Sequence, residues 1–119
     1  MTRRMERVGE SIREELARVL REEATDPRLR LLTLLRVDVA PDLTQALVFW
    51  SAMEAPGAPS VEEAQEGLRS AAAFLRRRLA QELRLRRMPS LDFRHDPSLS
   101  LGARTLALLH EIEHESQEG

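Results

Sequence analysis

The spacing of apolar and polar residues changes several times along the chain, and each spacing predicts a different element. Apolar residues between Met5 and Leu20 recur at steps of three and four, which indicates one face of an amphipathic helix. The Asp26-Pro27 pair predicts the end of that helix, because a residue before proline is pushed out of helical conformation. From Thr33 to Val39 apolar residues alternate with polar ones, which is typical of a strand with one solvated face.

The middle of the chain predicts a hairpin followed by a long helix. A second strand is expected over Ala46–Ala52, and the intervening Pro41–Thr44 has the composition of a turn. After a loop rich in proline, Ser60 and Glu63 fit a capping box, in which each side chain satisfies a free amide at a helix start. The helical pattern that follows is expected to end near Arg86–Pro89.

The last part of the chain predicts a short strand and a final helix. The strand covers Leu91–Phe93, a turn follows at Asp96-Pro97, and a helix over Leu101–Ile112 runs into a glutamate-rich tail. The order helix, strand, strand, long helix, strand, helix indicates an α+β fold, with a three-stranded sheet covered on one face by helices. We therefore divide the chain into a domain of residues 1–100 and a C-terminal helix and acidic tail of residues 101–119.

Composition excludes several classes of protein. The 119 residues contain no cysteine, which excludes disulfides, thiolate metal sites and cysteine nucleophiles and favours a reducing, cytoplasmic location. No apolar run approaches the ~20 residues that a membrane span needs. All 18 basic residues are arginines, so mechanisms that depend on a lysine are also excluded.

The charge is segregated along the chain, although the net charge is only −2. Residues 69–87 hold seven arginines and one acidic residue, Glu82. Four glutamates lie in residues 54–66 and four more in the last fifteen residues, with no arginine in either stretch. Segregated charge produces a local field that attracts a polyanion such as a nucleic acid.

On a helical wheel the arginines of the long helix lie beside its apolar seam. The seam contains Leu68, Leu75 and Leu79. The neighbouring cationic face contains Arg69, Arg76, Arg77, Arg84 and Arg87, around the small residues Ser70 and Ala73. A sugar–phosphate backbone can approach such small residues closely, and guanidinium groups make forked contacts to phosphate. The alternative is a solvated face whose arginines pair with acidic residues elsewhere in the chain.

Two other patterns in the sequence indicate different chemistry. Trp50 and Phe93 lie on predicted strands, where they are expected in the core rather than on a surface that stacks bases. The sequence His110-Glu111-Ile112-Glu113-His114 matches the zinc-binding pattern H-E-x-x-H, with His95 as the one histidine left for a third ligand. Its acidic, C-terminal setting does not favour a closed catalytic cavity, so we expect no metal, no cofactor, no small-molecule substrate and no enzymatic activity.

Several segments, taken in order, resemble the ribosome-binding factor A family. They are Arg7-Val8, Ile12 and Glu15-Leu16, then Asp26-Pro27-Arg28, then Val37 to Leu43 with Ala46 and Ser51, then Phe74-Leu75-Arg76 through Leu85-Arg86, and finally Pro89 to Phe93 and Asp96 to Leu99. The resemblance covers about residues 3–109.

The resemblance implies a type II KH-like fold with the order α-β-β-α-kink-α-β, in which two helices meet at a kink. The family carries an Ala-x-Gly kink, whereas this chain has Ala71, Ala72 and Ala73 there, preceded by Ser70. Alanine favours a continuous helix over glycine by about 1 kcal/mol, so we expect a bend that packing maintains.

The resemblance also implies a bacterial factor for late maturation of the small (30S) ribosomal subunit, with a role in cold adaptation. Such a factor binds 16S rRNA, promotes processing of its 5′ end, is a monomer when free and is not an enzyme. The RNA-binding residues expected here are Arg69, Arg76, Arg77, Arg84, Arg86 and Arg87, with a second cluster of Arg3, Arg4 and Arg7. Two alternatives remain, namely a protein–protein adaptor and a metal-dependent hydrolase that uses His110, Glu111 and His114.

Overall fold

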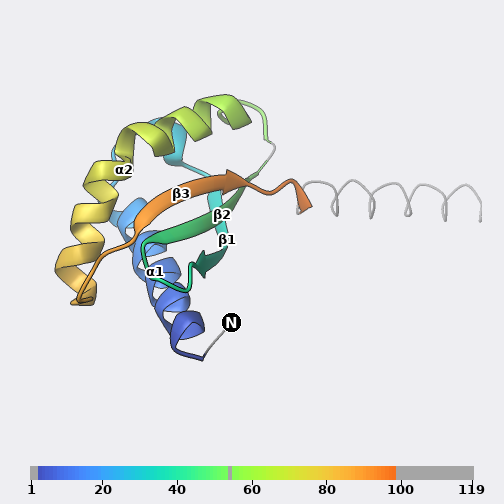
Figure 1. The fold of residues 1–119 in the computed structure, drawn as a ribbon. Coiled ribbons are helices and arrows are strands. Elements are labelled where there is room, and N and C mark those ends of the chain that lie inside the picture. Colours follow the sequence, from blue (N-terminus) through green and yellow to red (C-terminus); the bar gives the residue numbers. More distant parts are fainter. Residues whose placement is uncertain (1–2, 54, 99–119) are drawn as a thin grey trace, which may run out of the picture.

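The computed structural model describes residues 3–53 and 55–98 and confirms the α+β fold (Figure 1). In chain order the elements are α1 (Arg3–Glu22), the short 3-10 helix η1 (Pro27–Leu29), β1 (Leu32–Val39), β2 (Gln45–Ala52), α2 (Val61–Leu83) and β3 (Ser90–His95). The final helix that the sequence predicts over Leu101–Ile112 lies outside the described residues, as do the domain boundary after residue 100 and the acidic tail.

The three strands form one sheet in the order β1-β2-β3. β1 and β2 pair antiparallel as the predicted hairpin, with an irregularity between Leu34 and Arg36. β3 pairs parallel to β2, so α2 is the crossover that returns the chain to the same end of the sheet. β3 extends to His95, beyond the predicted strand, because its pairing with β2 continues as far as Trp50. α1 packs across β1, α2 packs against β3, and the two helices also contact each other.

Trp50 lies at the centre of the core, as the sequence predicts. Its side chain is completely buried, and Phe93 is nearly so. The indole Nε1 donates a hydrogen bond to Gln65 Oε1 at 3.0 Å, and Gln65 Nε2 donates to the Phe93 carbonyl at 3.2 Å. Gln65 therefore joins α2 to two strands and satisfies the one polar atom of the tryptophan ring.

α1 approaches β1 closely at Gly9. This glycine is buried in the face of the helix that crosses the sheet. A Cβ atom at this position would overlap the backbone carbonyl oxygen of Val37. The close approach fixes the N-terminal half of α1, and with it the arginines that this half carries.

α2 is one continuous helix, not the two helices that the family resemblance implies. Its start is the predicted capping box, in which Ser60 Oγ accepts from Glu63 N and Glu63 Oε1 accepts from Ser60 N. Figure 1 shows that α2 bends through its middle while remaining helical throughout. The stretch Ser70–Ala73, where the kink is expected, lies inside this unbroken helix.

α2 ends at Leu83, several residues before the predicted end. Arg84 adopts a left-handed conformation, with φ 49° and ψ 37°, and this turns the chain out of the helix. The placement of Arg84 and Arg87 on the helical wheel is therefore wrong. Both residues belong to the connection between α2 and β3, which leaves them free to face a different part of the molecule.

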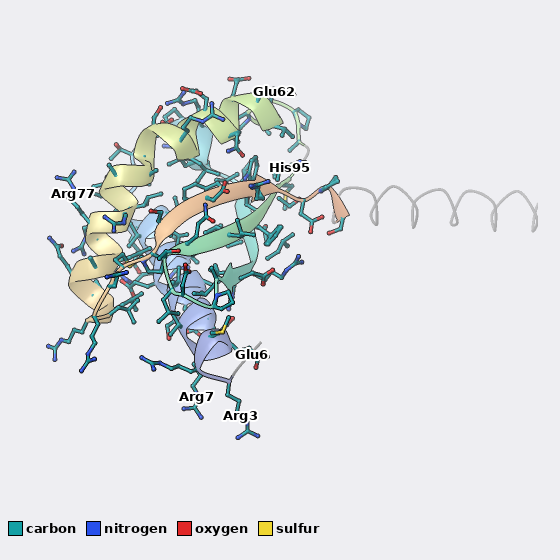
Figure 2. All side chains as sticks on the ribbon, in the orientation of Figure 1. Arg3, Glu6, Arg7, Glu62, Arg77 and His95 are labelled. Carbon is teal, nitrogen blue, oxygen red and sulfur yellow. The ribbon has the colours of Figure 1, made fainter. Side chains whose placement is uncertain are left out.

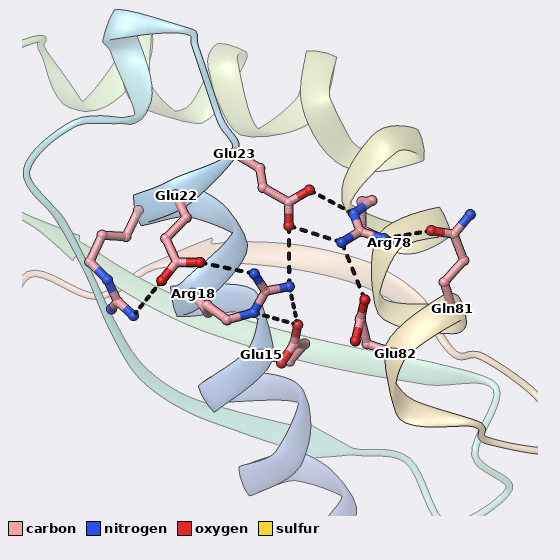
Figure 3. A network of polar contacts seen from close by, with 8 residues as sticks. Glu15, Arg18, Glu22, Glu23, Arg78, Gln81 and Glu82 are labelled. Carbon is pink, nitrogen blue, oxygen red and sulfur yellow. Dashed lines mark hydrogen bonds and ion pairs between the residues drawn. The ribbon is translucent and has the colours of Figure 1, made fainter.

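A network of charged side chains fastens the C-terminal part of α1 to α2 (Figure 3). Arg78 Nε donates to Glu23 Oε1 at 2.8 Å, and Arg18 pairs with Glu15, Glu22 and Glu23. The hydrogen bond from Arg78, with a smaller contribution from Arg18, holds the pKa of Glu23 below its ordinary value. Arg78 is thus occupied by a structural role, and its charge is largely compensated within the fold.

Candidate nucleic-acid interface

One groove brings together arginines from α1 and from the connection between α2 and β3. It has a volume of about 400 Å³ and lies between the N-terminal turns of α1, the β1–β2 turn and the α2–β3 connection. Its lining consists of Arg4, Val8, Asp42, Leu43, Arg84, Leu85, Arg86, Arg87 and Pro89. Figure 2 shows Arg3 and Arg7 at the N-terminal end of α1, close to Arg4 in the chain. The two arginine clusters that the sequence predicts separately therefore meet at one end of the molecule, which we call the basic end.

Arg76 holds one wall of this groove in place. Its Nη2 atom donates to the Met88 carbonyl at 2.8 Å, and its Nε atom donates to the Pro89 carbonyl at 3.3 Å. The backbone N–H of Ser90 then donates to the Thr44 carbonyl, which joins the connection to the β1–β2 turn. Arg76 thus has a positioning role, in addition to the RNA contact that the sequence predicts for it.

The β1–β2 turn supplies the opposite wall. Asp42 Oδ1 accepts hydrogen bonds from Thr44 Oγ1 at 2.7 Å and from Thr44 N at 3.1 Å. These two bonds, and to a lesser degree the positive charge of Arg87, hold the pKa of Asp42 below its ordinary value. Leu43 has a positive φ of 60° and a half-buried side chain. The turn therefore presents a carboxylate and an apolar side chain next to each other.

Most exposed arginines without a partner gather at the basic end and along the adjoining face of α2. Within the part of the chain that the structure describes, eight arginines make no hydrogen bond or ion pair with another described residue. Seven of them lie at the basic end or on the adjoining face of α2, namely Arg3, Arg4, Arg7, Arg77, Arg84, Arg86 and Arg87, and the eighth, Arg30, lies elsewhere. Arg77 projects outward from α2 in Figure 2. Arg69 forms an exposed ion pair with Glu66 at 3.2 Å, the kind of pair that contributes little to stability.

The outer face of the sheet carries an aromatic residue that the sequence reasoning did not single out. The guanidinium carbon of Arg36 lies 4.1 Å from the centre of the Phe49 ring, a cation–π contact. Arg36 pairs with Asp38 at 3.3 Å, and on the other edge strand Arg94 pairs with Asp92 at 2.9 Å. Strict alternation along β2 could have revealed Phe49, because its neighbour Trp50 faces the core. This face is balanced in charge and attracts a polyanion less than the basic end does.

Neither a metal centre nor a membrane span is found within the described residues. No group of three or more possible ligands gathers in residues 3–53 and 55–98. His95 packs against Trp50, with ring centres 4.9 Å apart, and the H-E-x-x-H motif with His110, Glu111 and His114 lies outside the described part of the chain. No described helix is both long and apolar enough to cross a bilayer.

The fold and the groove together define the class of protein: a small KH-like α+β module with an arginine-lined groove at one end. Residues 4–109 match the family model of ribosome-binding factor A. The chain is 38% identical to the ribosome-binding factor A of Pseudomonas fluorescens over 117 residues, which cover 98% of this chain and 88% of the relative. The chain therefore belongs to the ribosome-binding factor A family.

Solved structures agree with this assignment. The crystal structure of ribosome-binding factor A from Thermus thermophilus matches with a TM-score of 0.68 at 28% identity, over 76% of this chain and 93% of that protein. A homology model of the Thermus thermophilus factor, fitted into a cryo-EM map of its complex with the 30S subunit, matches with a TM-score of 0.62 at 29% identity, over 75% and 91% of the two chains. These matches support the type II KH-like architecture.

Proposed function

We propose that this chain is a ribosome-binding factor that binds the small (30S) ribosomal subunit in the cytoplasm and aids its late maturation. In this proposal it binds 16S rRNA, promotes processing of the 5′ end of that RNA and carries out no cleavage itself. Membership of the ribosome-binding factor A family supports the proposal, and so does the Thermus thermophilus factor that was fitted into a 30S complex.

The single observation that carries the RNA contact is the meeting of two arginine clusters around one groove. Arg4 approaches from α1, while Arg84, Arg86 and Arg87 approach from the α2–β3 connection. Arginine forks make two parallel hydrogen bonds to a phosphate, and such charge-assisted bonds are among the strongest that a protein surface offers. We assign the main RNA contact to these four residues and to Arg3, Arg7 and Arg77 beside them. Arg69 and Arg76 have partners within the fold, and we assign them a smaller share.

A factor without catalytic groups promotes maturation through differential affinity. Binding shifts a conformational equilibrium only as far as the factor prefers one state over the other. The proposal therefore requires that the chain bind a precursor of the small subunit more tightly than the mature subunit. The factor then leaves when the preferred conformation disappears.

Cosedimentation with purified precursor and mature small subunits at two salt concentrations tests the proposal. We expect binding to both particles, tighter to the precursor, and a marked loss at the higher salt concentration because phosphate contacts release counterions. If the chain sediments with neither intact particle at either salt concentration, the proposed function is wrong. Binding that does not depend on the salt concentration would show that the arginines do not make the main contact with the subunit.

A further inference from the structure

The groove at the basic end is apolar at its base and cationic at its edge. Val8, Leu43 and Leu85 are half-buried and pack against the hydrophobic core, and Pro89 is fully buried. The four arginines that line the same groove are exposed. An apolar floor does not favour phosphate binding, because burying a charged oxygen against aliphatic carbon costs free energy.

We propose that this groove holds one unstacked nucleotide of single-stranded RNA, with the base on the apolar floor and the phosphates among the arginines. The inference rests on the proposed function and specifies the kind of RNA that the site takes. A base presents a flat apolar face that packs on aliphatic side chains, and its sugar–phosphate lies at the edge where guanidinium groups are available. The volume of about 400 Å³ falls within the range of roughly 300–1,000 Å³ that small-ligand sites occupy.

Duplex RNA does not fit this arrangement. In a duplex the bases are stacked inside and the outer surface consists of sugars and phosphates. The apolar floor would then face charged phosphates, and its four side chains would make no productive contact. The groove therefore selects unpaired RNA through its floor, while the exposed arginines alone do not distinguish the two forms.

Asp42 adds a preference among bases. Asp42 Oδ1 accepts two hydrogen bonds from Thr44, and the side chain is exposed, so the carboxylate still offers acceptor lone pairs to a ligand. An ionised carboxylate accepts hydrogen bonds and repels phosphate, so the base rather than the phosphate lies towards Asp42. The amino groups of guanine, adenine and cytosine can donate to this carboxylate. Uracil can donate only its ring N3–H, which lies between two carbonyl oxygens that the carboxylate repels. The groove is thus expected to prefer guanine, adenine or cytosine to uracil.

Methyl NMR titrations with GMP, UMP and ribose 5-phosphate test the inference on the full chain. Ribose 5-phosphate carries the phosphate without a base. We expect GMP to shift the methyl signals of Val8, Leu43 and Leu85, and ribose 5-phosphate to shift only arginine Nε–H signals. GMP is expected to bind roughly fivefold tighter than UMP, which is the effect of about one additional hydrogen bond.

Leu43→Asn provides the critical variant. Asparagine tolerates the positive φ of 60° at this position better than leucine does, so the turn keeps its backbone while the floor loses an apolar side chain. GMP binding is expected to weaken to the level of ribose 5-phosphate, whose own binding stays unchanged. Leu31→Asn is the matched control, because Leu31 also has a positive φ, of 65°, and is half exposed outside the groove.

The outcomes separate this inference from the proposed function. If GMP and ribose 5-phosphate bind equally and Leu43→Asn changes neither, the groove is a phosphate site only and the inference is overturned, even when the chain still sediments with small subunits. If GMP shifts the groove methyls as expected in a chain that binds no subunit, the inference stands and the proposed function fails.

Discussion

Replacing Arg86 and Arg87 with glutamate is expected to weaken binding to the small subunit about 100-fold. A hydrogen bond to a charged group contributes roughly 1.5–3 kcal/mol, so two lost phosphate contacts at the lower end of this range cost about 3 kcal/mol, which corresponds to a factor on the order of 100. Both side chains lie in the α2–β3 connection, are exposed and make no hydrogen bond or ion pair with another described residue, so they are available to contact phosphate. The slope of log affinity against log salt is expected to become shallower by about 1.4 when two contacts to a single strand disappear.

The matched control for this double variant is Arg21→Glu with Arg30→Glu, which changes the net charge by the same amount. Arg21 lies in the last turn of α1 and Arg30 follows η1, so both are exposed and neither lines the groove at the basic end. The control is expected to bind nearly as well as the unchanged chain. Equal losses in the two double variants would show that net charge, and not the basic end, determines binding.

Gly9→Ala is expected to destabilise the fold by about 2 kcal/mol, a large part of the stability of a small domain. The added methyl group overlaps the Val37 carbonyl oxygen, which belongs to the backbone and cannot rotate away, so α1 must move off the sheet. The higher helix propensity of alanine offsets only about 1 kcal/mol of this cost. Because Val8 and Arg4 lie on the displaced segment, the groove is expected to lose part of its lining as well.

Urea unfolding measures this effect, and Gly67→Ala is its control. A Cβ atom at Gly67 would lie 3.0 Å from the Arg28 Cβ atom and 3.1 Å from the Leu29 Cδ2 atom, so η1 has to shift by only a few tenths of an ångström, whereas a Cβ atom at Gly9 would lie 2.4 Å from the Val37 carbonyl oxygen. We expect a lower midpoint with an unchanged m-value for Gly9→Ala, and a much smaller change for Gly67→Ala. A Gly9→Ala chain as stable as the original would contradict the close packing of α1 on β1.

The parts of the fold that local chemistry determines were predictable from the sequence. The Ser60 capping box and the hairpin each depend on residues close together in the chain, and both are confirmed. The burial of Trp50, expected from its place on an apolar strand, is confirmed as well. The η1 helix was missed because Asp26-Pro27 indicated only a helix end, whereas the Asp26 side chain also accepts from Arg28 N and caps a new turn.

The composition of the groove was not predictable in the same way. A left-handed residue at a helix end is commonly glycine, and here it is Arg84. The sequence therefore predicted a longer helix with Arg84 and Arg87 on its face. The approach of Arg4 to Arg84 depends on the parallel pairing of β3 with β2, which brings the start of β3 next to the β1–β2 turn. Contacts at that separation in sequence arise from tertiary packing, which a local pattern does not contain.

Site-directed hydroxyl-radical probing tests most directly whether the basic end faces the RNA. The chain has no cysteine, so single cysteines can carry an iron chelate without background labelling. Ala80→Cys places the chelate on an exposed position of α2, three residues after Arg77 and close to the end of the helix, whereas Ala55→Cys places it in the exposed loop between β2 and α2. In complexes with small subunits, we expect strong cleavage of 16S rRNA from position 80 and little from position 55. Strong cleavage from position 55 with none from position 80 would contradict the assignment of the basic end as the RNA-binding surface.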